Sequence, residues 1–141
     1  MASINDIQIA LTNFWGQFTH NPNAPRPLPV FRESRVPNVN GQPHPMPYLT
    51  YELTRGSWQS TYLTEINIWT RSNDITNNGT ANHILTQIAD AIPEGVGTMI
   101  KVGNGFMWLK RATNFSQEIT DPDDRAIIRY LVTVEVLSVL Q

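Results

Sequence analysis

The chain has 141 residues, of which 40% are hydrophobic and 16% are charged, and its formal net charge is -2 at pH 7. These values are typical of one globular domain. The negative net charge and the absence of Lys and Arg clusters in the sequence argue against tight binding of nucleic acid. Cysteine is absent, which excludes disulfides and thiolate sites. The sequence contains neither a secretion signal nor an apolar run of the roughly 20 residues that a membrane span needs. We therefore expect a soluble protein made in the cytoplasm.

The first predicted element is a helix of about four turns near the N-terminus. Ser3 followed by Asp6 is typical of a capping box. Apolar side chains then recur at three- and four-residue spacing, at Ile4, Ile7, Leu11, Phe14, Trp15 and Phe18. We interpret the aromatic members of this stripe as core residues that lie on a sheet.

A proline-rich segment follows at about residues 20–47. Its eight prolines stiffen the backbone and cannot donate ladder hydrogen bonds; they are Pro22, Pro25, Pro27, Pro29, Pro37, Pro43, Pro45 and Pro47. The segment also carries the apolar Phe31 and the cationic Arg35. Two interpretations remain open: an extended arm that packs on a neighbouring subunit, or a mobile loop.

The middle of the chain predicts a hairpin and a second helix. Residues 48–54 and 60–70 alternate in polarity and flank a turn that contains Trp58, which either folds back over the hairpin or contacts another chain. An amphipathic helix then precedes Pro93, with apolar residues at Ala81, Ile84, Leu85, Ile88, Ala91 and Ile92. Its start is open, because residues 77–79 either cap it or interrupt a longer helix that begins near Asp74.

The last third of the chain predicts a second hairpin and a long strand. Residues 98–102 and 106–110 flank the turn sequence 103–105, residues 115–120 form a weaker strand, and residues 121–124 form a turn. Residues 127–140 alternate without Gly or Pro, which predicts a strand inside the sheet with one buried face made of Ile128, Tyr130, Val132, Val134 and Val136.

The predicted fold is therefore one α+β domain over residues 1–141, with the element order α-β-β-α-β-β-β. A mainly antiparallel sheet of four to five strands, with a mixed sheet as the alternative, is covered by two helices.

No residue pattern indicates catalysis, a cofactor or a metal. His20, His44 and His83 are scattered without metal-ligand spacing. Asp121, Asp123 and Asp124 lie in a Pro-containing turn, where solvated aspartates are common. We therefore predict no catalytic, cofactor-binding or metal-binding residues, and a protein that is not an enzyme.

Five stretches spread over nearly the whole chain carry a family resemblance. They are residues 13–15, residues 35–37 through 47–52, residues 68–72, residues 105–110, and residues 115–117 leading to 121–125 and the final strand. Together they resemble the tail terminator (tail completion) proteins of long-tailed bacteriophages, the lambda-type family and its relatives. Residues 77–80 depart from the family pattern, which has an uninterrupted helix there.

The resemblance implies a structural protein of the virion that forms a homo-hexameric ring at the head-proximal end of the tail. Such a ring stops polymerisation of the major tail tube protein and presents a docking surface to head-completion proteins. DNA would pass through the ring without specific binding, and no membrane is involved. A weakly acidic subunit suits this passage, because a basic wall would retain the phosphates.

Within this interpretation, Phe31, Arg35 and Trp58 are candidates for subunit contacts, because apolar or cationic side chains in loops otherwise lack partners. Two alternatives remain open: a head-tail connector or stopper component, and a small ligand-binding or enzymatic α+β domain.

Overall fold

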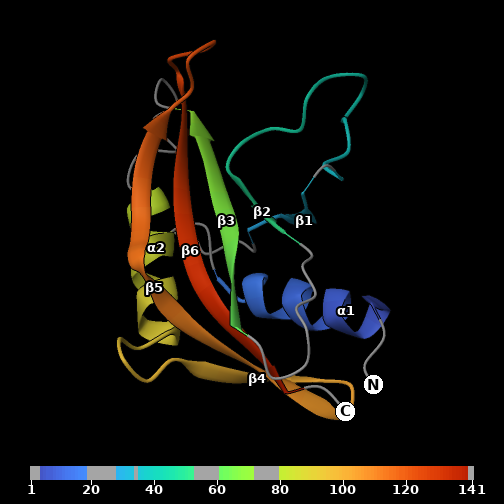
Figure 1. Cartoon of the computed structure of the whole chain (residues 1–141). Helices are drawn as coiled ribbons and strands as arrows, with labels where there is room; N and C mark the ends of the chain where they lie inside the picture. The colour runs from blue at the N-terminus through green and yellow to red at the C-terminus, as the bar shows by residue number, and fades with distance from the viewer. Residues whose placement is uncertain (1–3, 19–27, 34, 53–60, 72–79, 140–141) are drawn as a thin grey trace.

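The structure is a computed structural model that describes residues 4–18, 28–33, 35–52, 61–71 and 80–139. Its elements follow in the order α1 (Ile4–Trp15), β1 (Val30–Arg32), β2 (Tyr48–Tyr51), β3 (Thr61–Arg71), α2 (Thr80–Ala91), β4 (Thr98–Val102), β5 (Gly105–Thr120) and β6 (Ile127–Val139). The strands form one sheet in the order β1-β2-β3-β6-β5-β4, as Figure 1 shows. The predicted α+β class with two helices is thus confirmed.

The predicted number and order of strands were wrong in two places. The sheet has six strands, because β1 forms inside the proline-rich segment where three residues free of proline pair in parallel with β2. This makes the sheet mixed and the order α-β-β-β-α-β-β-β. Residues 106–110 and 115–120 also belong to one strand, β5, whose register along β6 shifts between Arg111 and Ser116. A bulge bends a strand without ending it, which explains why two strands were predicted.

The central position of β6 confirms the prediction for the last stretch of the chain. It pairs antiparallel with β3 on one side and with β5 on the other. Val132, Val134 and Val136 on its even-numbered face are at most 1% exposed, whereas Ile128 and Tyr130 are half-buried. The apolar burial described for this strand therefore lies mainly in its middle, from Val132 to Val136.

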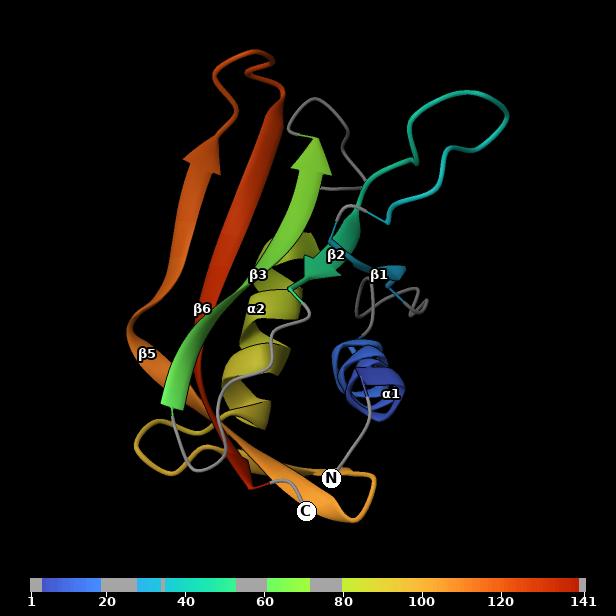
Figure 2. The same cartoon turned by 45° about the vertical axis from the view of Figure 1, so that its right-hand side comes forward.

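Strand register assigns the sheet residues to two faces. The inner face includes Leu49, Ile68, Val132 and Leu109, which are all buried in one core. Both helices contribute to the same core, α1 through Ile7, Leu11 and Trp15, and α2 through Ile84, Ile88 and Ile92. Figure 2 shows α2 behind β3 and β6, and α1 between the β1-β2 end and the β4-β5 end of the curved sheet. The opposite face, here called the outer face, includes Trp69 and Arg129 and has neither described helix on it.

Polar contacts fix each helix to the sheet. The Tyr51 hydroxyl of β2 lies 2.7 Å from Thr12 Oγ1 of α1. The Arg111 guanidinium of β5 donates to the carbonyl oxygens of Ala89 and Ile92, at 2.6 and 2.7 Å, at the C-terminal end of α2. These carbonyls have no partner within a helix, so the cation satisfies them and complements the helix dipole.

Helix boundaries agree with the predicted apolar stripes. Helix α1 ends at Trp15, and Phe18 is buried just beyond it. The described part of α2 begins at Thr80. The predicted capping residue Ser3 and the alternative starts of the second helix, Asp74 and residues 77–79, lie outside the described residues. Neither described helix has the length and apolar content needed to cross a bilayer.

Candidate assembly surfaces

The outer face of the sheet carries an aromatic cluster at the base of the proline-rich segment. The cluster consists of Phe31, His44, Tyr48 and Trp69. Phe31 lies 4.9 Å from His44 and 6.0 Å from Tyr48 between ring centroids, and Tyr48 stacks on Trp69 at 6.4 Å. The cluster joins β1, the segment before β2, and β3. It therefore holds both ends of the intervening loop on the sheet.

Trp69 also makes polar and cationic contacts on this face. Its indole Nε1 donates to Thr50 Oγ1 at 3.0 Å, and the Arg129 guanidinium lies 5.8 Å from its ring centroid. The indole of Trp69 on β3 reaches over Thr50 on β2, and Thr50 is buried although no described helix covers it. The outer face is thus ordered by contacts between side chains of neighbouring strands.

Residues 35–47, here called the arm loop, project from the body of the protein beyond this cluster (Figures 1 and 2). At its tip Val39 and Gln42 exchange two backbone hydrogen bonds of 2.8 and 3.0 Å. Asn40 and Gly41 between them have positive φ values of 53° and 75°. Both values fit a tight hairpin turn, for which Asn-Gly is a preferred sequence. The arm loop therefore carries a preformed turn away from the core.

The three predicted contact residues differ in their surroundings. Phe31 is half-buried and has partners in its own chain, so it does not lack contacts as the sequence suggested. Arg35 is exposed, and its side chain makes no hydrogen bond or ion pair with any described residue. Trp58 lies outside the described residues. A role of these residues in subunit contacts stays a prediction.

Three carboxylates lie close together beside the aromatic cluster: those of Glu33 and Glu65 on the outer face by register, and that of Glu52 at the end of β2, where it also lines a cavity beneath α1. Glu65 lies on β3, whereas Glu33 and Glu52 follow β1 and β2. The Glu52 amide donates to the Glu65 carbonyl at 3.4 Å, and the Glu52 carboxylate accepts from the Glu65 amide at 3.2 Å and from the Thr64 hydroxyl at 3.4 Å. Partial burial raises the pKa of Glu33, and the carboxylates of Glu52 and Glu65 raise it further, whereas Arg129 lowers it. The four charged groups are therefore close enough to interact. Residues 33, 52 and 65 are here called the carboxylate row.

The outer face of the β4-β5 hairpin carries a different patch. Met99 and Phe106 are 57% and 43% exposed, and Lys101 and Trp108 share their face by register. The Trp108 indole donates to the Val96 carbonyl at 2.8 Å, which fixes the ring against the turn that precedes β4. These four residues are here called the hairpin patch. It is apolar and cationic, whereas the carboxylate row is anionic.

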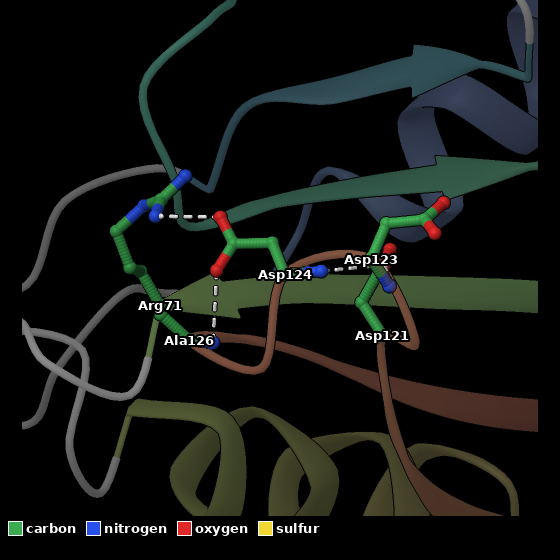
Figure 3. A network of polar contacts seen from close by, with 5 residues as sticks. All are labelled: Arg71, Asp121, Asp123, Asp124 and Ala126. Atoms are coloured by element: carbon green, nitrogen blue, oxygen red, sulfur yellow. Dashed lines mark hydrogen bonds and ion pairs between the residues drawn. The ribbon is translucent and has the colours of Figure 1, made fainter.

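The histidines and aspartates considered as metal ligands have other surroundings. His44 belongs to the aromatic cluster, His83 is half-buried on α2, and His20 lies outside the described residues. In Figure 3 the Asp121 carboxylate accepts the amides of Asp123 and Asp124, and the Asp124 carboxylate accepts the Ala126 amide and pairs with Arg71 at 3.3 Å. These carboxylates thus stabilise the turn. Within the described ranges, no group of three or more His, Asp or Glu could hold a metal ion.

A small cavity lies between α1 and the sheet. Its volume is about 10 Å³, close to that of one water molecule. Leu11, Trp15, Ile66 and Met107 are among the residues that line it, so its wall is mainly apolar. We interpret it as a packing defect of the core.

Sequence reasoning missed the carboxylate row, the hairpin patch and the turn of the arm loop. The Asn40-Gly41 pair was a readable signal for the turn. The row combines residues from three strands, so it becomes visible only with the register. Comparison with protein-family models and with curated proteins finds no match to this sequence.

Proposed function

We propose that the protein is a tail terminator subunit: a structural virion protein that forms a hexameric ring and caps the head-proximal end of a phage tail tube. In this role it stops elongation of the tube and then provides the docking surface for head-completion proteins. DNA passes through the ring without specific binding. The proposal rests on the resemblance described above and on the placement of side chains at the surface.

The observation that carries the proposal is the arm loop. Its base is held by the aromatic cluster, and its Val39–Gln42 turn is closed by two backbone hydrogen bonds far from the core. An element of this kind adds little to the burial of its own chain's apolar surface, yet it presents a preordered surface to a neighbour. A loop that is preorganised in this way lowers the entropy cost of an intersubunit contact.

The surfaces of the sheet give further support. The hairpin patch contains two large apolar side chains that are about half exposed, and it includes a lysine. Exposed apolar patches of soluble proteins commonly mark contacts with other proteins. A subunit in a ring needs two different contact surfaces, one for each neighbour, and the outer face has two such regions of unlike chemistry.

Mass measurement and a capping assay test the proposal. Light scattering and sedimentation should give a species of six chains of 16.0 kDa each, about 96 kDa in total, either for the free protein or after addition of tube ends. Added to polymerising major tail tube protein, the chain should shorten the tubes, and electron microscopy should show it at one end only.

Three results would decide against this function or its details. Tubes that elongate unchanged would contradict the terminator role. Binding to head-completion proteins without binding to the tube would favour the connector or stopper alternative. A sub-micromolar dissociation constant for duplex DNA at physiological salt, measured by fluorescence anisotropy, would contradict passage without binding.

A further inference from the structure

Glu33 and Glu65 of the carboxylate row and Lys101 of the hairpin patch have complementary charge and lie in different parts of the same outer face. We propose that the hairpin patch of one subunit docks on the carboxylate row of the next subunit, with Lys101 placed among the carboxylates of Glu33 and Glu65. The inference rests on the proposed function, because it names the contact that closes the ring.

The positions of the two surfaces suit a head-to-tail contact. In the sheet order β1-β2-β3-β6-β5-β4, the carboxylate row belongs to one edge and the hairpin patch to the other. Figures 1 and 2 show the β4-β5 hairpin at one end of the molecule and β1, β2 and the arm loop toward the other. Surfaces that differ and face different neighbours produce a heterologous contact, which closes into a ring when the rotation between subunits allows it.

Within the described residues, the carboxylate row has one nearby cation, Arg129, which lowers the pKa of Glu33 but forms no ion pair with a carboxylate of the row. Arg71 and Asp124 form an ion pair at 3.3 Å, but this pair is a separate site from the carboxylate row. Arg129 faces the row but lies over the Trp69 ring, and Arg32 points to the opposite face by register. Arg55 lies outside the described residues. A lysine ammonium brought by a neighbour would offset the repulsion among the three carboxylates.

A buried acceptor beside the row also lacks a donor. Asn67 is 1% exposed, lies on the outer face two residues after Glu65, and its Oδ1 makes no hydrogen bond in the described part of the chain. A buried acceptor without a donor costs about 1–3 kcal/mol. An ammonium carries three N–H donors, so a lysine that enters beside this buried oxygen can donate to the exposed carboxylates of Glu33 and Glu65.

The apolar parts of the two surfaces match in spacing. On β4, Met99 lies two residues before Lys101 on the same face, and on β1, Phe31 lies two residues before Glu33. Two residues along a strand correspond to about 7 Å. When Lys101 meets the row, Met99 and Phe106 can therefore cover the exposed parts of Phe31 and its aromatic neighbours, which removes apolar surface from water.

A charge-swap experiment tests this contact in the full-length protein. Lys101→Glu and Glu65→Lys should each weaken ring association by about tenfold or more, because each places like charges opposite each other. The double variant should recover association to within about threefold of the wild type, because the pair is restored in reverse order. The readout is the dissociation constant by sedimentation velocity or, where the ring forms only on tube ends, the concentration that halves tube elongation.

Matched controls separate this contact from net charge and from folding. Arg125→Glu and Asp90→Lys make the same changes in charge at exposed positions outside both surfaces, and they should leave association unchanged. All variants should unfold in one transition with a midpoint no lower than that of the wild type. Carbodiimide cross-linking of mixed labelled and unlabelled wild-type rings should join the Lys101 peptide to the Glu33 or Glu65 peptide between chains.

Each outcome decides a different point. If both single variants associate as well as the wild type, the contact is overturned and the terminator function stands. The same holds if the single variants associate weakly and the double variant does not recover association. A wild-type protein that neither forms rings nor caps tubes would overturn the proposed function and this contact together.

Discussion

The two faces of the sheet are built from the same strands, yet they differ in how their side chains are held. On the inner face of β3, Ile66 and Ile68 are at most 1% exposed and pack beneath two helices. On the outer face of the same strand, Glu65 is exposed and Trp69 is half-buried, held by a hydrogen bond and a cation. The inner face therefore supplies most of the hydrophobic stabilisation, and the outer face is held mainly by contacts between its own side chains.

The largest expected effect tests this division on one strand. Ile68→Ala should lower the free energy of unfolding by about 2–5 kcal/mol, because it opens a cavity in a fully buried site. Leu63→Ala, on the outer face and 63% exposed, should change it by less than about 0.5 kcal/mol. Urea denaturation measures both. Equal losses in the free energy of unfolding would show that Leu63 is covered by other residues of its own chain.

Gly97 tests whether the hairpin patch depends on a fixed backbone. Its φ is 73°, and a Cβ there would overlap the Leu109 carbonyl oxygen and lie 2.8 Å from Trp108 Nε1. Gly97→Ala should cost about 3 kcal/mol, and Gly95→Ala, with a φ of 78° but open space around it, about 1 kcal/mol. Thermal or urea unfolding gives both values. Similar losses would mean that only the backbone conformation matters.

Arg111 places a charged side chain on the inner face at the end of α2, so replacing it sharpens the comparison of the two faces. Arg111→Lys keeps the charge but loses the planar fork that reaches the Ala89 and Ile92 carbonyls. We expect a loss of about 1–2 kcal/mol in the free energy of unfolding, measured by urea denaturation. Arg125→Lys, at an exposed turn position, is the control and should be neutral. A neutral Arg111→Lys would show that charge near the helix end is sufficient.

The same comparison explains how much could be predicted from the sequence. Burial on one face of a strand or helix leaves a period of 2 or 3.6 in the sequence, so the apolar stripes of both helices and the internal position of β6 were predictable. The bulge in β5 was predicted only as a break between two strands, because a sequence pattern that interrupts a strand does not distinguish a register shift from a strand end. The short strand β1 was hidden by the prolines around it.

The outer face left no comparable signal in the sequence. Glu33, Glu52 and Glu65 are separated by 13 residues or more along the chain, and only the register of β1, β2 and β3 brings them together. Phe31 was singled out from the sequence because it is apolar in a proline-rich segment, but the aromatic rings that surround it come from distant positions. Contacts of this kind depend on topology, which a single sequence pattern does not encode.

Two tyrosines of β2 provide a smaller test of the division between faces. The Tyr51 hydroxyl on the inner face lies 2.7 Å from Thr12 Oγ1, whereas the Tyr48 hydroxyl on the outer face makes no hydrogen bond within the described residues. Tyr51→Phe should cost about 1 kcal/mol in the free energy of unfolding, and Tyr48→Phe less than about 0.5 kcal/mol. The Tyr51 hydroxyl also donates to the Gln8 carbonyl oxygen at 3.4 Å, so a double-mutant cycle with Thr12→Ala should show how much of the loss at Tyr51 comes from the Thr12 pair.

The smallest expected effect concerns pH and the carboxylate row. Because burial and the neighbouring carboxylates raise the pKa of Glu33 above its ordinary value of 4.5, the folded chain holds this proton more tightly than the unfolded chain. The stabilising contribution of the proton is therefore complete below pH 4.5 and is lost as the pH rises through the raised value. Glu33→Gln removes this dependence, so the isolated subunit should become slightly more stable at neutral pH and unchanged at low pH.

Urea denaturation of the monomer at several pH values measures this effect, and Glu94→Gln at an exposed turn position is the control. In the ring that we propose, the effect of Glu33→Gln on stability should have the opposite sign, because the Glu33 carboxylate would there attract Lys101 of the adjacent subunit. Glu33→Gln should thus stabilise the monomer and weaken the ring. A substitution that stabilised both, or neither, would show that the row is only a solvated part of the outer face.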